Sequence, residues 1–422
     1  MVDEVAGDGV VDLVTMGCAW TLDLTALDDR LADETRDRWG RCVDLAADPG
    51  TIRLDEEPTT VRVGLGDLPA TAATGSVVTA SDPERLPYVL SREITRLGLT
   101  RLRGRAGLLH AAALADAEGR AVVLVAPSGG GKSTATRVLG ERLGYVTDES
   151  VVLLADGRIA PHPKPPSLVI DPADRWHKAE PAPDEVGLGP TPAAPRIAAL
   201  LTLGRDPDAT HSRIEPVGLL DQLLAVLPET SSTWWLDDGL DRLARAVTAG
   251  GAPARLVYAE VDTCHDLVAE HLAQAAPAEP TWEHLPPTAP ERLPRDDEVS
   301  APQTSHSPTA MRTDQAMGSE TSHSPTAMRR EGAADRVVRA RWSDAIASDG
   351  EVLVLAGPRP LRLAGPGAVV WRAAREPVTV ADLTTTVVAE LGEHPEADRI
   401  VGAAVADLID HGALRRVASP AP

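Results

Sequence analysis

The stretch that decides the fold is AVVLVAPSGGGKSTATRVLG, residues 121–140. An apolar run typical of a buried strand meets a glycine cluster, and Lys132, Ser133 and a segment with helical periodicity follow. Glycines let successive backbone N–H groups converge on phosphate oxygens, and the N-terminus of the next helix adds partial positive charge. The stretch therefore predicts a phosphate-binding loop between a strand and a helix.

The polar residues of this loop predict a nucleotide site with ATP and Mg²⁺. Lys132 is expected to reach the β- and γ-phosphates, and the Ser133 hydroxyl is expected to coordinate Mg²⁺. The usual pattern is G-x-x-x-x-G-K-[ST], and this chain has Ala126 in place of the first glycine. The expected nucleotide-binding residues are Ser128, Gly129, Gly130, Gly131, Lys132, Ser133 and Thr134.

Candidate catalytic residues lie on both sides of the loop. The motif YVTDES, residues 145–150, places Asp148 and Glu149 at the end of an apolar stretch. Paired acids there can hold Mg²⁺ and take a proton from an attacking hydroxyl, although such a pair can also be a solvated turn. Upstream, His110 ends the apolar GLLH, and a lone histidine of this kind is more often structural.

Composition restricts the class of protein. The chain has 422 residues and a formal net charge of −22, which argues against a nucleic-acid partner or an anionic membrane surface. No run reaches the roughly 18 apolar residues that a membrane span needs. The N-terminus lacks the layout of a signal peptide, and the cysteines are single and far apart. We therefore expect a cytoplasmic protein. Its 41 basic residues include only three lysines, so a lysine in the glycine loop is notable.

Sequence character changes along the chain and predicts four segments. Residues 1–104 read as a small N-terminal α/β region, with helical spacing over 86–102. Residues 105–285 alternate strand and helix signals around the loop. Residues 286–335 are rich in Pro, Ser, Thr and acids and contain TSHSPTAMR twice, at 304–312 and 321–329. This composition predicts a disordered linker, with a phosphorylatable or partner-binding tract as the alternative. Residues 336–418 read as a hairpin over 351–363 and three helices, and Thr379 can cap the second helix.

The motifs LLHAAAL, APSGGGKST and LGYVTD, in this order and spacing, resemble the HPr kinase/phosphorylase family, and the resemblance implies that His110 of the first motif lies on a strand. These are P-loop kinases related in fold to phosphoenolpyruvate carboxykinase, and the resemblance covers residues 105–275. It implies that Lys132 and Ser133 bind nucleotide and Mg²⁺, that Asp148 is the base for a serine hydroxyl, and that Glu149 binds the metal with His110 assisting. The family usually has Asp-Asp at the acidic pair. No segment resembles the hexamer-forming C-terminal part of HPr kinases, so HPr is not the expected substrate.

The motifs DGEVLVL, RLAGPGAVVWRA, TVADL and VADLIDHGAL of residues 336–418 are similar to PqqD-type domains, which are small winged-helix folds. The resemblance implies that this domain binds the leader of a ribosomally made precursor peptide as an edge strand. A DNA-binding winged helix is the rival, but acids outnumber arginines here and no basic stripe is present. The expected core positions are Leu363, Val370, Trp371, Leu383, Leu408 and Leu414.

Together these features predict an α/β protein with a P-loop kinase core of the HPr kinase/phosphoenolpyruvate carboxykinase type, a small N-terminal α/β region and a C-terminal winged-helix, PqqD-like domain. The expected activity is transfer of the γ-phosphoryl group of ATP to a Ser or Thr hydroxyl of a precursor peptide, alongside other peptide-modifying enzymes. One alternative is a non-catalytic, nucleotide-dependent peptide carrier. Another is a nucleotide-sensing regulator that binds DNA.

Overall fold

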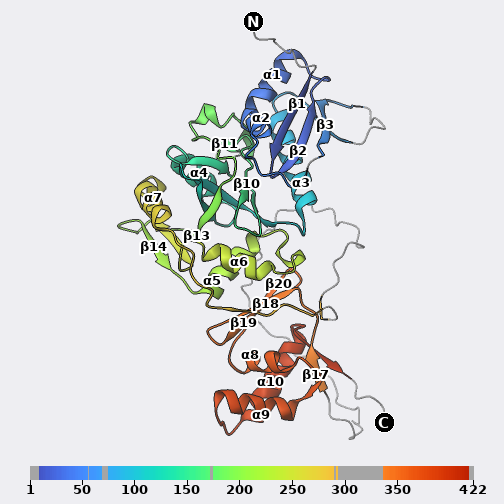
Figure 1. The fold of residues 1–422 in the computed structure, drawn as a ribbon, viewed down its shortest axis with the longest axis vertical. Coiled ribbons are helices and arrows are strands. Elements are labelled where there is room, and N and C mark those ends of the chain that lie inside the picture. Colours follow the sequence, from blue (N-terminus) through green and yellow to red (C-terminus); the bar gives the residue numbers. More distant parts are fainter. Residues whose placement is uncertain are drawn as a thin grey trace. The chain divides into compact units, whose positions relative to one another are not determined.

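The computed structural model describes residues 9–55, 57–68, 75–171, 174–288, 291–292 and 336–417. Both copies of the duplicated tract, and most of the predicted linker, lie outside these residues. The protein is mixed α/β, as expected (Figure 1). Its described residues form two compact units, one within Met1–Pro287 and Ser343–Leu363, the other within Thr288–Trp342 and Ala364–Pro422.

The first unit begins with an N-terminal α/β layer. Strands β1 (Val10–Thr15) and β2 (Cys18–Asp23) are antiparallel, and β3 (Thr59–Leu65) and β4 (Gly75–Ala80) continue the sheet in parallel. Helices α1 (Asp29–Arg38), α2 (Gly40–Ala47) and α3 (Leu86–Leu102) accompany it. Trp20 and Trp39 share a buried cluster with Leu90 and Ile94 of α3, so the helical spacing over residues 86–102 predicted this helix correctly.

A second, six-stranded sheet forms the centre of the unit, in the order β14-β15-β13-β7-β6-β8. Its middle strands β7, β13 and β15 are parallel, and β6, β8 and β14 are antiparallel to their neighbours. Because both faces of a parallel sheet are covered, its strands are near-continuous apolar runs such as VVLV in β7. The strands are β6 (Ala111–Ala115), β7 (Arg120–Val125), β8 (Gly144–Thr147), β13 (Arg196–Arg205), β14 (Arg213–Pro216) and β15 (Ala254–Tyr258).

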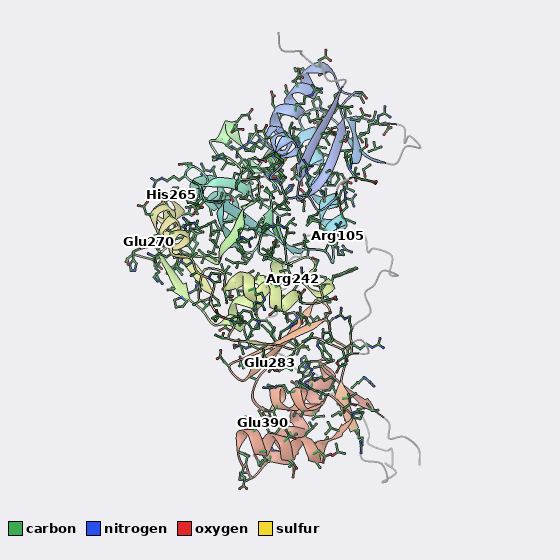
Figure 2. All side chains as sticks on the ribbon, in the orientation of Figure 1. Arg105, Arg242, His265, Glu270, Glu283 and Glu390 are labelled. Carbon is green, nitrogen blue, oxygen red and sulfur yellow. The ribbon has the colours of Figure 1, made fainter. Side chains whose placement is uncertain are left out.

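Helices cover both faces of the six-stranded sheet. Helices α4 (Lys132–Leu139) and α7 (His265–Gln274) pack on the face that carries Val122 and Leu124. Helices α5 (Leu219–Val226) and α6 (Gly239–Val247) pack on the opposite face with Val123. The exposed Glu270 of α7 (Figure 2) points away from buried Val268, since residues two apart in a helix point about 200° apart. The glycine-rich segment between β7 and α4 thus lies inside a three-layer α/β/α arrangement.

Short elements complete the first unit. They are β5 (Gly107–Leu109), β9 (Val151–Leu153), β10 (Ile159–Ala160), β11 (Leu168–Asp171), β12 (Asp174–Ala179) and the 3₁₀ turns η1 (Asp184–Val186), η2 (Leu227–Glu229), η3 (Thr233–Trp235) and η4 (Val261–Cys264). Strands β5, β9 and β10 form a three-stranded sheet, and β11 pairs with β12. The segments around them bring Asp148, Pro166, Leu168, Val186 and Leu188 to a pocket that Ser133 and Thr136 of α4 also line.

A four-stranded sheet of the first unit packs on α6. It consists of β16 (Glu283–His284), β18 (Asp344–Ser348), β19 (Glu351–Ala356) and β20 (Arg359–Leu363). The predicted hairpin over 351–363 is present, with its turn at Gly357. Ile346 and Leu353 share a hydrophobic cluster with Leu240 of α6. The strands that the sequence grouped with the C-terminal domain are therefore part of the core around α6.

The second unit contains three helices and a small sheet. Strand β17 (Arg336–Arg339) lies between β21 (Val378–Thr379) and β22 (Leu414–Val417), beside α8 (Gly365–Ala373), α9 (Val380–Leu391) and α10 (Ala397–Asp410). The Thr379 hydroxyl caps α9 by accepting from the Asp382 backbone N–H, which fulfils the prediction for this helix start. Every core position predicted from 336–418 is buried. Among the described residues, no helix is both long and apolar enough to cross a membrane.

Candidate functional site

The glycine loop joins β7 to α4 through left-handed backbone. Gly129 has φ 78° and Gly131 has φ 95°, a region that side chains with a Cβ rarely adopt. Gly131 is the N-cap of α4, so the helix begins at Lys132. Ser128, Ser133 and Thr134 are exposed around this turn. The predicted strand–loop–helix backbone is therefore present, with its N–H groups at the start of a helix.

Ala126 fits the loop because Gly130 has no side chain. A Cβ built on Gly130 would lie 2.8 Å from the Ala126 Cβ and 2.9 Å from the Pro127 carbonyl oxygen. Such distances are shorter than carbon contacts in packed protein, so a side chain at Gly130 would force the loop to move. The departure from the usual first glycine is thus accommodated by the glycine that approaches it.

Lys132 is buried within the loop. Its ammonium donates to the Ala126 carbonyl at 2.5 Å and lies 3.9 Å from Glu229 Oε2. Burial lowers the pKa of Lys132, although the carboxylates of Glu229 and Glu149 oppose this shift. The Lys132 ammonium therefore points toward its own loop, and Glu229 is the acid that it contacts.

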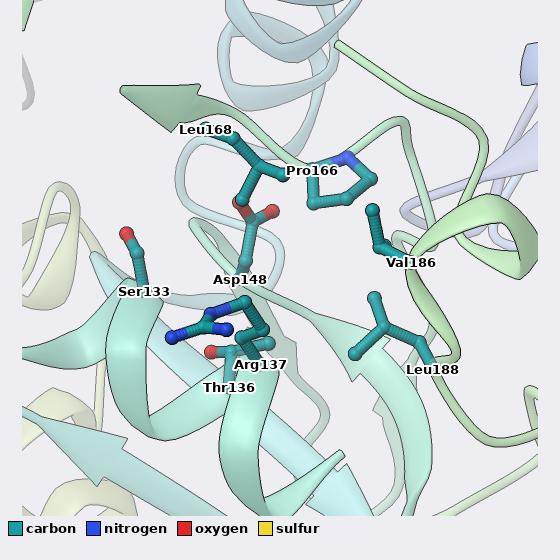
Figure 3. A pocket seen from close by; sticks show the side chains of 8 residues that line it. All are labelled: Ser133, Thr136, Arg137, Asp148, Pro166, Leu168, Val186 and Leu188. Carbon is teal, nitrogen blue, oxygen red and sulfur yellow. The ribbon is translucent and has the colours of Figure 1, made fainter. Parts of the chain in front are cut away.

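Ser133 and Asp148 line the same pocket (Figure 3). Asp148 is 7% exposed, and its Oδ2 accepts from the Ser167 backbone N–H at 3.2 Å. Its Oδ1 accepts from the Tyr145 hydroxyl at 2.8 Å. Burial, together with Asp148, raises the pKa of Tyr145, which keeps that hydroxyl a donor. The other lining residues are Thr136 and Arg137 of α4, and Pro166, Leu168, Val186 and Leu188.

Lys164 joins the two acids of the pair and was not anticipated from the sequence. It is fully buried, and its Nζ lies 3.2 Å from Asp148 Oδ1 and 3.3 Å from Glu149 Oε2. Burial would lower the pKa of Lys164, but the surrounding carboxylates outweigh it and raise that pKa. Burial would likewise raise the pKa of Glu149, but the Lys164 ammonium lowers it. Asp148 and Glu149 therefore share one cation, the Lys164 ammonium.

Glu180 is a third acid of this cluster that the sequence did not single out. It is 5% exposed, and its Oε1 accepts from the Ser167 hydroxyl. Its Oε2 is buried without a hydrogen-bond partner in the described part of the chain. Burial raises the pKa of Glu180 to about 7, against the opposing effect of Lys164. Ser167 thus links Glu180 to Asp148, through its hydroxyl and its backbone N–H.

His110 lies in the bend between β5 and β6 rather than on a strand. Its backbone N–H donates to the Glu229 carbonyl at 2.6 Å, and its Nδ1 lies 3.2 Å from Glu229 Oε2. Burial, followed by the Lys132 ammonium, lowers the pKa of His110, although Glu149 and Glu229 oppose this. Glu229 stands in no recognisable motif, yet it joins two of the predicted catalytic residues.

The structure thus brings the predicted residues together in pairs. Ser133 and Asp148 share a pocket, Asp148 and Glu149 share Lys164, and His110 and Lys132 share Glu229. Within the described ranges no group of three or more His, Cys, Asp or Glu side chains is arranged to hold a metal ion. Mg²⁺ commonly takes only one or two carboxylates and completes its shell with phosphates and water. The hard oxygen donors of Ser133, Asp148 and Glu149 are of the type that this ion prefers.

No protein-family model matches the chain, and no curated protein matches it.

Proposed function

We propose that this chain is an ATP-dependent phosphotransferase with a P-loop kinase core of the HPr kinase type. The acceptor is a Ser or Thr hydroxyl of a ribosomally made precursor peptide. The observation that carries the proposal is the shared pocket of Ser133 and Asp148: a hydroxyl at the first turn of the loop helix faces the same space as a buried carboxylate. Phosphoryl transfer needs positioning and charge neutralisation rather than covalent catalysis, and these groups supply both.

The loop binds the phosphates of ATP in this account. Backbone N–H groups of residues 128–133 and the N-terminus of α4 face the anion, and Lys132 leaves the Ala126 carbonyl to contact the β- and γ-phosphates. Ser133 and Glu149 would hold Mg²⁺. When bound, this ion neutralises charge that develops between the β- and γ-phosphates.

Asp148 acts as the base. It accepts the proton of the acceptor hydroxyl as the acceptor oxygen bonds to the γ-phosphorus, and the bond from phosphorus to the β–γ bridging oxygen breaks, releasing ADP. Tyr145 and the Ser167 N–H hold the carboxylate at both oxygens, which fixes its direction. His110, which shares the Glu229 carboxylate with Lys132, assists.

The acceptor side of the pocket is mostly apolar, with Pro166, Leu168, Val186 and Leu188 beyond Asp148. These apolar side chains beside the base exclude water, which would otherwise compete with the acceptor hydroxyl. This arrangement favours an acceptor carried on a peptide over a small, fully hydrated polyol.

The winged-helix, PqqD-like domain captures the leader of that peptide in the proposal. The β17–β22 pair and helices α8–α10 supply a small sheet and three helices, and the lack of an excess of basic residues over acids in their sequence disfavours DNA as the ligand. The chain passes directly between the two units at Trp342–Ser343 and at Leu363–Ala364, so a leader bound by the second unit raises the local concentration of the peptide core near the loop.

The experiment is a transfer assay with γ-³²P-ATP and a degenerate peptide library in which a central Ser or Thr is flanked by random residues. We expect labelled phosphoserine or phosphothreonine with the native chain, and none with Lys132→Met. Arg142→Ala, on an exposed side chain, is the matched control and should transfer label normally. Absence of label from every peptide, together with absence of Lys132-dependent ATP hydrolysis, would contradict the proposal.

A further inference from the structure

Lys164 is the most unusual cation in the first unit. It is a fully buried lysine in a chain that otherwise uses arginine almost throughout, and it lies between β10 and β11 rather than in the loop motif. Its Nζ contacts Asp148 Oδ1 at 3.2 Å, Glu149 Oε2 at 3.3 Å and the Pro165 carbonyl at 3.2 Å. The Lys164 ammonium therefore contacts both the proposed base, Asp148, and the proposed metal ligand, Glu149.

A buried ammonium carries a large desolvation cost, and an apolar side chain of similar volume would pack more favourably at a site that served structure alone. The backbone of Lys164 is also held, because the Tyr145 hydroxyl lies 3.1 Å from its carbonyl and 2.8 Å from Asp148 Oδ1. The Tyr145 hydroxyl and the Lys164 ammonium thus both contact Asp148, and the same hydroxyl contacts the Lys164 carbonyl. Together these contacts hold the proposed base in place.

The charges that face Lys164 are mostly acidic. Glu180 is a third carboxylate near it, and burial together with Lys164 lowers the pKa of His162 to about 3, so His162 is a neutral neighbour. Thr15 and Thr95 hydroxyls hold both ring nitrogens of His162, at 2.6 Å and 3.0 Å. The remaining titratable groups around the cluster are the Cys42 thiol, Tyr145, His110 and Lys178. Lys164 is therefore the cation that directly contacts Asp148 and Glu149 among the described residues.

We propose that Lys164 is a positioning residue for phosphoryl transfer: its ammonium holds Asp148 toward the acceptor, partly neutralises Glu149 beside the metal position, and prevents these adjacent carboxylates from turning apart. The inference rests on the proposed phosphotransferase function. It assigns Lys164 no contact with ATP, which the loop and Lys132 bind.

Two effects of removing the ammonium can be separated. In Lys164→Met the acids lose their common partner, so kcat should fall by about tenfold or more while the affinity for ATP without metal stays unchanged. The same change leaves more negative charge beside the metal position, so a divalent cation should bind more tightly, by about threefold or more. A lysine with a merely structural role would, on removal, weaken metal binding and catalysis together.

The test compares Lys164→Met, Lys164→Arg and the double variant Lys164→Met/Glu180→Gln. Mn²⁺ binding is followed by electron paramagnetic resonance at pH 8 with a non-hydrolysable ATP analogue, and kcat and KM are measured in the transfer assay. We expect tighter Mn²⁺ binding with lower kcat in Lys164→Met. Lys164→Arg, which keeps a cation, should recover most of kcat. The double variant, which has the native charge, should return Mn²⁺ affinity to the native value without restoring kcat.

Unchanged or weaker Mn²⁺ binding in folded Lys164→Met, or a kcat within about twofold of native, would overturn the proposal. If Lys164→Met does not fold, the test depends on Lys164→Arg. A folded Lys164→Arg protein with native Mn²⁺ affinity and most of the native kcat supports the proposal. A folded Lys164→Arg protein with weakened Mn²⁺ binding overturns it. Because Mn²⁺ binding needs no acceptor, this measurement stands even if no phosphoryl transfer is found. Lack of any transfer by the native chain would be a failure of the proposed function alone.

Discussion

The carboxylate of Glu229 lies 3.2 Å from the His110 ring, and the same oxygen lies 3.9 Å from the Lys132 ammonium. The two residues are also joined by a backbone hydrogen bond, in which the His110 N–H donates to the Glu229 carbonyl. Glu229 ends the 3₁₀ turn η2, which continues directly from α5. A residue almost a hundred positions after the loop therefore sets the electrostatic environment of its lysine.

Replacing Glu229 with Gln should tighten ATP binding. In the proposed binding mode Lys132 contacts the phosphates of ATP, and the Glu229 carboxylate, 3.9 Å from its ammonium, repels them. Removing this charge should relieve the repulsion and free the ammonium. We expect the dissociation constant of a fluorescent ATP analogue to fall by about fivefold, corresponding to ~1 kcal/mol. Glu260→Gln, which alters an exposed acid, is the control. Weaker binding in Glu229→Gln would show that Glu229 instead orients Lys132 for the phosphates.

Gly130→Ala should disrupt the loop. The new Cβ would lie 2.8 Å from the Ala126 Cβ, a contact that costs roughly 1–3 kcal/mol in a packed site. ATP affinity should fall with stability, as measured by urea unfolding and by titration. Ala126→Gly/Gly130→Ala removes this clash but keeps the one with the Pro127 carbonyl, so recovery should be partial. Gly402→Ala, in open space on α10, should be neutral or stabilising. Native behaviour of Gly130→Ala would refute the packing argument.

The His284–Asp344 pair should make stability depend on pH. His284 Nε2 lies 2.7 Å from Asp344 Oδ1, and the hydrogen bond to Asp344 raises the pKa of His284 above its usual value of about 6.5. A raised folded-state pKa means that the stabilisation is complete below about pH 6.5 and is lost as pH rises through the folded-state pKa.

The measurement is urea unfolding of the native chain and His284→Gln between pH 5.5 and pH 9. We expect the native chain to be more stable than the variant at the acidic end, and this difference to shrink as pH rises. A difference that grows with pH would reverse the sign of the argument. His211→Gln, at an exposed histidine, is the control for the general effect of pH.

Arg339 should be the most sensitive cation of the second unit. Its guanidinium lies 3.9 Å from the Trp371 ring centroid and donates to the Trp371 carbonyl at 2.6 Å. It also donates to the Arg372 carbonyl at 2.8 Å. Arg339→Met should lower the free energy of unfolding by about 2–4 kcal/mol, since it leaves those carbonyls without a donor. Arg399→Ala, on an exposed side chain, should change it by less than about 0.5 kcal/mol. Equal effects of the two variants would contradict this role.

Local sequence patterns predicted local structure well. The loop between β7 and α4, the helix over 86–102 and the hairpin over 351–363 each follow from a few adjacent residues, and all are present. The placement of His110 was less accurate, because the apolar run GLLHAAAL hides a bend between two short strands. That bend turns the imidazole toward Glu229.

The rest of the site was not predictable from local pattern. Lys164, Glu180 and Glu229 stand in loops or short elements without a motif, and chain topology alone brings them to the loop. The same applies to the hairpin β19–β20: its alternation predicted two strands but not their packing against α6. Contacts between distant segments depend on strand order and helix packing, which a single sequence encodes only collectively.

The central claim is that Asp148 takes the proton of an acceptor hydroxyl while the loop holds ATP. The most direct measurement is single-turnover transfer from γ-³²P-ATP in Asp148→Asn, with ATP affinity measured on the same sample and Asp266→Asn, an exposed change, as the control. The account predicts unchanged ATP affinity and a transfer rate lower by about 10²–10⁴-fold, the usual contribution of a positioned base. Transfer by Asp148→Asn at the native rate would contradict it.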